Sequence, residues 1–236
     1  MNSVDPVAST QALTLPRLER QPFERRALVS GTLTALTWGA AILGSIPLFS
    51  VIFMLVTKGG ARLDLEALTG LPPAGFAMGG GFGNAIVGTL SMVGIATLIS
   101  VPIGILAAIY LSVLGPASKI ASVSRFVAKT LTGFPSILAG VFTYAVLVIS
   151  FGYSALAGGV ALAVLMLPTV VLAAEEAMKQ VPQRMKDAAF GMGCTRTQVI
   201  WKVVIPTGLP GILTGVMLAV AGAAGESAPL LFTALF

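Results

Sequence analysis

Five long apolar runs constrain this chain more than any other feature of its sequence. They cover residues 27–57, 84–114, 131–150, 154–174 and 207–236. A helix needs about 20 residues to cross the hydrocarbon core of a bilayer, and every run reaches that length. We therefore predict an all-α, polytopic helical membrane protein. Residues 27–236 would form one transmembrane domain with five spans, behind a tail of residues 1–26.

The composition agrees with membrane surroundings and removes most kinds of catalysis. Hydrophobic residues make up 56% of the chain and charged residues 10%, whereas a soluble domain carries about 25% charged residues. Histidine is absent and Cys194 is the only cysteine. The chain therefore lacks the side chains for histidine-based acid–base catalysis, for a His/Cys metal site and for an intrachain disulfide. We predict no catalytic residue and no metal ligand.

The Lys and Arg residues fall almost entirely on one side of the predicted spans. Of the 14, twelve lie in the tail, in the 119–129 connection and in the 175–206 stretch, which alternate onto one side. Lys58 and Arg62 lie on the other side. Because cytoplasmic connections are enriched in Lys and Arg, we predict a cytoplasmic N terminus and a cytoplasmic 175–206 stretch.

The two ends of the apolar region lead to separate expectations. The first run is too long for the apolar core of a signal peptide, which has about 7–15 residues, so we interpret it as an uncleaved span. The last run is still apolar at Phe236. We expect a sixth span to be missing after this residue, and a natural five-span protein is the alternative.

The 175–206 stretch is the only large polar element between the runs, and it predicts two short helices joined by a turn. Pro182 suits the first turn of a helix, and Gly193 suits a helix end where φ is positive. Thr195 and Gln198 have the spacing of a capping box, which would begin the second helix. Pro206 is expected to end that helix. Both helices would lie against the inner face of the membrane.

The first of these helices carries small and flexible apolar side chains on one face. Met185, Ala188, Ala189 and Met192 recur at helical spacing. Alanine allows close approach of another backbone, and methionine can repack in a partner's groove. Two interpretations stay open on these residues alone: a docking surface for a partner protein, or an interfacial helix that lies on lipid.

The same stretch carries a longer motif. It reads Asp187-Ala188-Ala189, three residues, Gly193, nine residues, and then Val203-Val204-Ile205-Pro206. This pattern resembles the EAA loop of ABC importer permeases, with Asp187 in place of Glu and Ile205 in place of Leu. The resemblance implies a MetI-like transmembrane domain of an ABC type I importer. It also implies that the 182–206 loop couples to a separate ATPase through six residues: Asp187, Ala188, Ala189, Gly193, Ile205 and Pro206.

Three further segments extend the resemblance. Residues 79–112, 133–142 and 225–234 are similar to the phosphate permeases of the PstA type. This implies a non-catalytic subunit of an ATP-driven importer of inorganic phosphate, in the cytoplasmic (inner) membrane of a bacterium. It also implies three partners: a PstB-like ATP-binding subunit, a second, PstC-like permease subunit and a PstS-like periplasmic phosphate-binding protein. Two positions depart from the family pattern, because Val113 replaces a usual Glu and Gly222 replaces a usual Arg.

The chain has no Walker loop, so ATP is expected on the partner subunit and no cofactor is expected to bind this chain directly. The lipid bilayer is a further partner, and nucleic acid is not expected because the polar loop is tethered to the membrane at both ends. Three alternatives remain: a permease for another oxyanion such as sulfate or molybdate, an ATP-independent secondary transporter, and a membrane scaffold with no transport role. Transporters of the second kind often contain internal repeats, and none is found here.

Three residues are candidates for the translocation path. Glu226 is the only carboxylate well inside an apolar run, where an ionisable side chain indicates function. The alternative places it at the outer interface, about 20 residues after Thr207. Pro135 and Ser136 follow Gly133 in the third run, and such interruptions are tolerated where they line a cavity. Ser136 could offer its hydroxyl to an oxyanion, or it could bond its own helix at a packing kink.

Overall fold

The part of the chain that the structure describes is helical. The computed structural model describes residues 25–60, 64–73 and 79–234, and within them it contains helices and turns but no strand. The chain divides into two units, residues 1–64 and residues 65–236. The predicted all-α class is confirmed.

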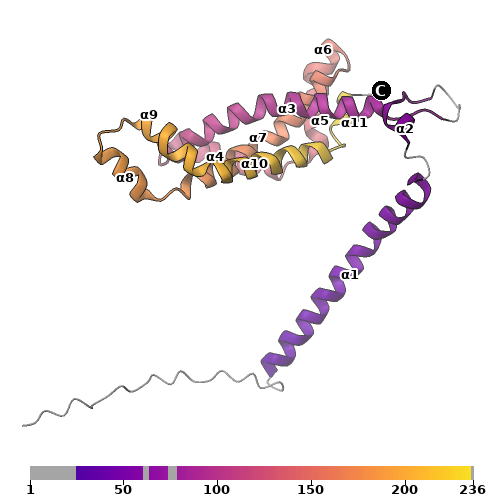
Figure 1. Cartoon of the computed structure of the whole chain (residues 1–236), viewed down its shortest axis with the longest axis horizontal. Coiled ribbons are helices and arrows are strands. Elements are labelled where there is room, and N and C mark those ends of the chain that lie inside the picture. The colour runs from indigo at the N-terminus through magenta and orange to yellow at the C-terminus, as the bar shows by residue number, and fades with distance from the viewer. Residues whose placement is uncertain (1–24, 61–63, 74–78, 235–236) are drawn as a thin grey trace, which may run out of the picture. The chain divides into compact units, whose positions relative to one another are not determined.

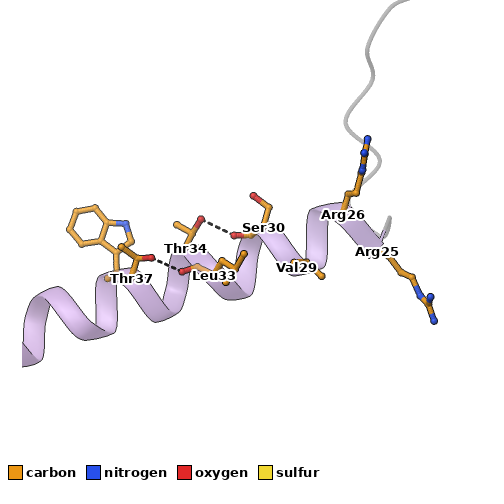
Figure 2. Close-up of a pocket in the computed structure, with 8 residues that line it drawn as sticks. Arg25, Arg26, Val29, Ser30, Leu33, Thr34 and Thr37 are labelled. Atoms are coloured by element: carbon orange, nitrogen blue, oxygen red, sulfur yellow. Dashed lines mark hydrogen bonds between the residues drawn. The ribbon is translucent and has the colours of Figure 1, made fainter.

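The first unit contains one long helix, α1 (Arg25–Gly59), which has 35 residues (Figure 1). None of its residues is buried. Five of its seven hydroxyl side chains bond back to the helix itself. Thr34 Oγ1 donates to the Ser30 carbonyl and Thr37 Oγ1 donates to the Leu33 carbonyl, each at 2.8 Å (Figure 2). An apolar medium can therefore surround α1 without leaving these hydroxyls unsatisfied.

The second unit is built around α7 (Ala155–Lys179), which packs along both α3 (Gly83–Ile109) and α10 (Ile205–Gly225). The three helices run side by side in Figure 1. Small residues fill much of the buried space between them, among them Ala96, Gly104, Ala163 and Ala219. Ser100 Oγ donates to the Ala163 carbonyl at 3.0 Å inside the α3–α7 interface. Small residues and an interhelical hydrogen bond are typical of helices that pack within a membrane.

Among the described residues, four helices are long and apolar enough to cross a membrane. They are α1, α3 with its continuation in the π turn η2 (Tyr110–Leu114), α7, and the continuous helix Arg196–Gly225. A fifth span is present if a bent pair of helices counts as one. The four helices thus correspond to four of the five predicted apolar runs, and the third run corresponds to the bent pair.

The third run begins inside a helix that the sequence did not separate from its polar surroundings. This helix, α4 (Lys119–Thr132), starts at an N-cap where Ser118 Oγ accepts from the Ala121 N–H at 3.0 Å. It is amphipathic and carries Lys119, Arg125 and Lys129. The apolar pattern therefore becomes continuous only near residue 131, although the helix starts twelve residues earlier.

A sharp bend follows α4. The chain turns by 103° at Gly133–Pro135 and continues as α5 (Ser136–Thr143), the π turn η3 (Tyr144–Val148) and α6 (Ile149–Phe151). Proline has no N–H to donate and keeps the preceding residue out of the helical region, which explains the position of the break. In Figure 1, α6 stands away from the three packed helices.

Pro206 does not end a helix, contrary to the prediction. The helix passes through it from α9 (Arg196–Val199) and the π turn η4 (Ile200–Val204) into α10. The Ile205 N–H donates to the Ile200 carbonyl, five residues back. In this wider π turn the hydrogen bonds already join residues five apart, so the missing N–H of Pro206 interrupts no regular α-helical bond. The chain therefore stays helical beyond Pro206.

The last apolar run is not one helix to its end. α10 ends at Gly225, Glu226 adopts an extended backbone (φ −88°, ψ 113°), and the short helix α11 (Leu230–Thr233) begins after Pro229. Residues 235–236 lie outside the described residues. The expected sixth span stays a prediction.

α2 (Leu65–Thr69) lies beside the start of α3. The Gly81 N–H donates to the Leu71 carbonyl at 2.9 Å, and the Gly83 N–H donates to the Gly70 carbonyl at 3.0 Å. These bonds hold the glycine-rich segment before α3 against the end of α2.

Candidate functional site

The polar loop 182–206 lies where α7 ends and α10 begins, at the end of the bundle labelled α8 and α9 in Figure 1. Pro182 occupies the N-cap position of α8 (Gln183–Gly191). Gly193 has a φ of +80°. Thr195 and Gln198 form a capping box, with Thr195 N–H donating to Gln198 Oε1 at 2.8 Å and Gln198 N–H donating to Thr195 Oγ1 at 3.4 Å. The predicted helix–turn–helix is confirmed.

Ala189 holds this loop to the bundle. Its side chain is only 2% exposed. It belongs to a buried cluster that joins the loop to the ends of α3 and α7, with Ala108, Ile109, Ala174, Met178, Val199 and Val204. The prediction that Ala189 shares an outward face with Ala188 is wrong, because one position along a helix is a rotation of about 100°.

Apolar side chains nevertheless cover the outer surface of α8 and the residue after it. Met185 and Phe190 are each 43% exposed and Met192 is 78% exposed, and Ala188 is exposed as well. Phe190 was not among the predicted residues. The sequence signal for it was a large aromatic residue among charged and polar neighbours. Phe190 lies five residues after Met185, a rotation of about 140° around α8, so the two side chains leave the helix on different sides.

The other predicted coupling residues have different environments. Asp187 is exposed on α8, and its Oδ1 accepts from Gln183 Nε2 at 2.9 Å. Ile205 is half-buried against the same cluster as Ala189, and Pro206 is exposed on α10. The motif therefore combines an exposed helix with residues that hold its loop in place.

A groove of about 330 Å³ lies between α7 and α10. Its lining is mostly apolar, and its two polar members are Thr169 and Glu226. Glu226 is partly exposed and follows the last residue of α10, at the far end of that helix from the 182–206 loop. No Lys or Arg of the described residues is within ion-pair distance of it. Glu226 thus lies at the end of α10 and also lines the groove between α7 and α10.

Thr169 is the residue of this groove that the sequence analysis missed. Other threonines within these helices, such as Thr97 and Thr214, donate to the carbonyl four residues earlier. Within the described residues the Thr169 hydroxyl has no such partner. It is half-buried and lines the groove, so it is available to a bound molecule.

Pro135 and Ser136 do not line the groove. Pro135 is exposed at the N-cap of α5, and Ser136 is half-buried and forms no side-chain hydrogen bond within the described residues. The alternative in which Ser136 bonds its own helix is therefore wrong. The bend at these residues instead brings α5 against the turn that follows Glu226, where Gly140 meets Pro229.

A hollow of about 570 Å³ along α1 is not a candidate site. In the described part of the chain, side chains of α1 alone line it, from Arg25 to Trp38 (Figure 2). One helix does not enclose a ligand. Among the described residues, no group of His, Cys, Asp and Glu is placed to hold a metal ion.

The fold and the loop define a class of protein. Residues 100–236 match the family model for the inner membrane component of binding-protein-dependent transport systems, and the chain belongs to this family of ABC importer permeases. It is therefore a multi-pass membrane subunit for transport, and ATP hydrolysis in such a system takes place in a separate subunit.

Its relatives carry a more particular name. The phosphate transport system permease protein PstA of Pasteurella multocida is 40% identical over 214 residues, which cover 90% of this chain and 76% of that protein. PstA of Haemophilus influenzae is 41% identical over 201 residues, covering 85% and 71%. The "Probable phosphate transport system permease protein PstA" of Methanocaldococcus jannaschii is 42% identical over 194 residues, covering 82% and 68%. The predicted resemblance to PstA-type permeases is confirmed.

A solved structure supports the fold. The MetNI methionine ABC transporter, in an inward-facing conformation, superposes with a TM-score of 0.56 at 22% identity, covering 63% of this chain and 72% of that chain. The predicted MetI-like importer fold is confirmed. The family assignment removes the ATP-independent secondary transporter from the alternatives.

Proposed function

We propose that this chain is the PstA-like permease subunit of an ATP-driven importer that passes inorganic phosphate across a bacterial cytoplasmic membrane. The observation that carries the proposal is an identity of about 40% to phosphate transport permeases, kept over 82% to 90% of this chain. Residues 27–236 would form the transmembrane domain, and residues 1–26 a cytoplasmic tail.

The charge distribution supports a cytoplasmic 182–206 loop. An ion-pair cluster adds independent support, since two of the predicted cytoplasmic segments meet in it. Arg125, from the 119–129 connection, and Lys179, from the 175–206 stretch, both bind Glu175. The two segments therefore lie at the same end of the bundle, as a cytoplasmic assignment of both requires.

The exposed surface of α8 would dock on a PstB-like subunit, which would hold the ATP. Met185, Phe190 and Met192 offer exposed apolar side chains on α8 and on the residue after it. Ala188 between them allows close approach, and Ala189 and Ile205 fix α8 to the bundle. Force applied to α8 would thus reach α3, α7 and α10 through packed side chains.

The groove between α7 and α10 would form this subunit's share of the phosphate path. A Thr169 hydroxyl can donate to a phosphate oxygen, and a Glu226 carboxylate can accept only from a protonated one. Sulfate carries no proton at neutral pH, so this carboxylate would favour phosphate. A PstC-like second permease subunit would supply the cation that balances Glu226, and a PstS-like periplasmic protein would deliver phosphate at this end of α10.

Reconstitution of the complete importer in vesicles tests the proposal. The chain would be assembled with its ATPase, its companion permease and the phosphate-loaded binding protein, and uptake of labelled phosphate would be measured. We expect uptake that requires ATP and that a tenfold excess of sulfate does not reduce. Uptake without ATP would contradict the importer mechanism, and equal competition by sulfate or molybdate would contradict the substrate.

One observation favours a permease for another oxyanion as the second candidate. Gly222 lines the groove close to Glu226, at the position where the PstA pattern has an Arg. A groove without its own cation binds any oxyanion less strongly, and it depends more on the companion subunit for selectivity. The same competition experiment separates the two candidates.

A further inference from the structure

α7 carries a buried carboxylate one turn before its end. Glu175 is 3% exposed, and its Oε1 accepts from Arg125 Nε at 2.6 Å and from Lys179 Nζ at 2.7 Å. A carboxylate buried this deeply needs such partners, because the loss of one leaves an uncompensated charge. Arg125 and Glu175 are 50 residues apart in the chain, so no local sequence pattern links them.

The other nitrogens of Arg125 hold the end of a different helix. Nη2 donates to the Leu111 carbonyl at 2.6 Å, and Nη1 donates to the Pro116 carbonyl at 2.9 Å. Leu111 lies in the π turn η2, where a carbonyl accepts from the fifth residue along, as Tyr110 accepts from the Gly115 N–H. The fifth residue after Leu111 is Pro116, which has no N–H. Arg125 supplies the missing donor.

One guanidinium group therefore joins three helices at the end of the bundle that carries the 182–206 loop. Arg125 belongs to α4, its two carbonyl acceptors follow α3, and Glu175 belongs to α7. Apart from this contact, the buried residues of α4 are two alanines, Ala121 and Ala128. The 182–206 loop begins directly beyond α7 and packs through Ala189 on the ends of α3 and α7. Tyr110 Oη lies 3.2 Å from Ser118 Oγ at the start of α4. Arg125 is the charged link within α4 that ties this helix to both α3 and α7, the helices on which the loop rests.

α4 in turn leads toward the groove. It ends at the bend that starts α5, and α5 touches the turn after Glu226 where Gly140 meets Pro229. A continuous series of contacts therefore connects the loop to the groove without following α10: first Glu175 and Arg125, then α4, the bend and α5.

We propose that Arg125 is a positioning residue for coupling. It makes α4 move together with the 182–206 loop, so that a displacement of the loop reaches the Glu226 groove through α4 and α5 as well as through α10. The inference rests on the proposed function, in which the loop docks on an ATPase. It adds a second route for the motion and a residue on which that route depends.

The test compares Arg125→Lys, Arg125→Gln and the double variant Arg125→Gln/Glu175→Gln in the reconstituted importer. Lysine keeps the positive charge, but its single ammonium group cannot donate to the Glu175 carboxylate and to two carbonyls at once, as the planar guanidinium group does. The double variant removes both charges and leaves no unpaired carboxylate. We expect each variant to lower the amount of substrate taken up per ATP hydrolysed by about tenfold, as substitutions along a mechanical route do. Because the two residues act through one contact, the loss in the double variant should equal the loss in Arg125→Gln alone.

Lys129→Gln is the matched control. Lys129 is an exposed cation one turn further along α4 and has no ion pair within the described residues, so its removal should leave uptake per ATP unchanged. A purely structural role for Arg125 would reduce the amount of assembled complex but not this ratio. If Arg125→Lys and the double variant took up as much substrate per ATP hydrolysed as the parent importer, the inference would be overturned. Absence of ATP-dependent uptake in the parent would instead contradict the proposed function.

Discussion

Gly140 of α5 lies directly against Pro229 in the turn that follows Glu226. A Cβ atom on Gly140 would lie 2.7 Å from the Pro229 carbonyl oxygen and 2.7 Å from its Cα. Pro229 is itself buried, so the turn cannot move away from α5 without displacing the residues that cover it. The absence of a side chain at residue 140 thus allows α5 to support the segment that carries Glu226.

The substitution Gly140→Ala should therefore destabilise the protein and impair transport. Forcing a methyl group against a buried backbone costs about 1–3 kcal/mol, and relief requires movement of the turn next to Glu226. The measurements are the apparent unfolding temperature of the purified complex and its phosphate uptake. Gly94→Ala is the control, because a Cβ at Gly94 of α3 meets no atom within 4 Å. Equal effects of the two substitutions would contradict this account.

Gly193→Val should uncouple ATP hydrolysis from transport. The φ of +80° at Gly193 lies in the left-handed region, where a β-branched residue is strained by about 1–3 kcal/mol. Nothing lies within 4 Å of a Cβ at this position, so the effect would come from the backbone alone. Gly193→Asn is the informative comparison, because asparagine tolerates positive φ. We expect near-parental coupling with Asn and a loss with Val; equal losses would exclude the backbone explanation.

Ala188→Trp and Ala189→Trp should fail in different ways. Ala188 is exposed, so an indole there should leave the subunit folded but prevent docking of the ATPase. Ala189 is 2% exposed, so an indole there should overpack the buried cluster and destabilise the loop by about 1–3 kcal/mol or more. Co-purification with the ATPase and thermal stability in detergent distinguish the two. Normal ATPase binding by Ala188→Trp would contradict the docking surface.

Glu226→Gln should lower phosphate uptake by about tenfold while delivery of the binding protein to the complex stays normal. The amide keeps the shape of the side chain but removes the charge and replaces one acceptor with a donor. Thr169→Val should produce a smaller loss, because it removes one neutral hydrogen-bonding group. Glu66→Gln, at an exposed position of α2, serves as the control for loss of a carboxylate. Parental uptake by Glu226→Gln would place this residue at the interface and outside the path.

The companion subunit gives a second test of Glu226. If an Arg of that subunit balances the carboxylate, its replacement by Gln and Glu226→Gln should be non-additive when combined. Strictly additive losses in the logarithm of the uptake rate would mean that the two side chains do not interact.

Single cysteines in a Cys194→Ser background should report the predicted sidedness. Arg26→Cys and Lys186→Cys are expected to react with a membrane-impermeant thiol reagent only after the membrane is opened. Leu71→Cys should react in intact spheroplasts, since Leu71 is exposed and lies in the connection predicted to be outside. The readout is the extent of labelling on each side, and a cytoplasmic Leu71→Cys would invalidate the assignment of every span.

In the polar loop, some features could be predicted from adjacent residues and others could not. The positive φ of Gly193 and the capping box of Thr195 follow from the chemistry of a few adjacent residues, and both were predictable. The position of Ala189 was not, because an alanine suits an outward face and a buried cluster equally well. Its burial depends on the distant residues Ala108 and Ala174, which tertiary packing brings to it.

The residues of the candidate translocation path also include some that the sequence predicted and some that it did not. An ionisable residue in an apolar run is visible in the sequence, so Glu226 could be singled out. Its neighbour Thr169 could not, because an intrahelical threonine normally satisfies its own hydroxyl. The bend at Pro135 was visible, but its consequence was not, since the direction of α5 after the bend determines that Gly140 meets Pro229.

The sequence alone determined the class of this protein: apolar runs of sufficient length dictate membrane helices, the Lys and Arg distribution predicts their direction, and a loop motif indicates the transport family. These signals are local, because each depends on residues close together in the chain. Only the tertiary structure decided which side chains share a groove, which alanine faces inward and that Arg125 completes the hydrogen bonding of Leu111. Those relationships join residues that are far apart in the chain, and helix packing alone brings them within bonding distance.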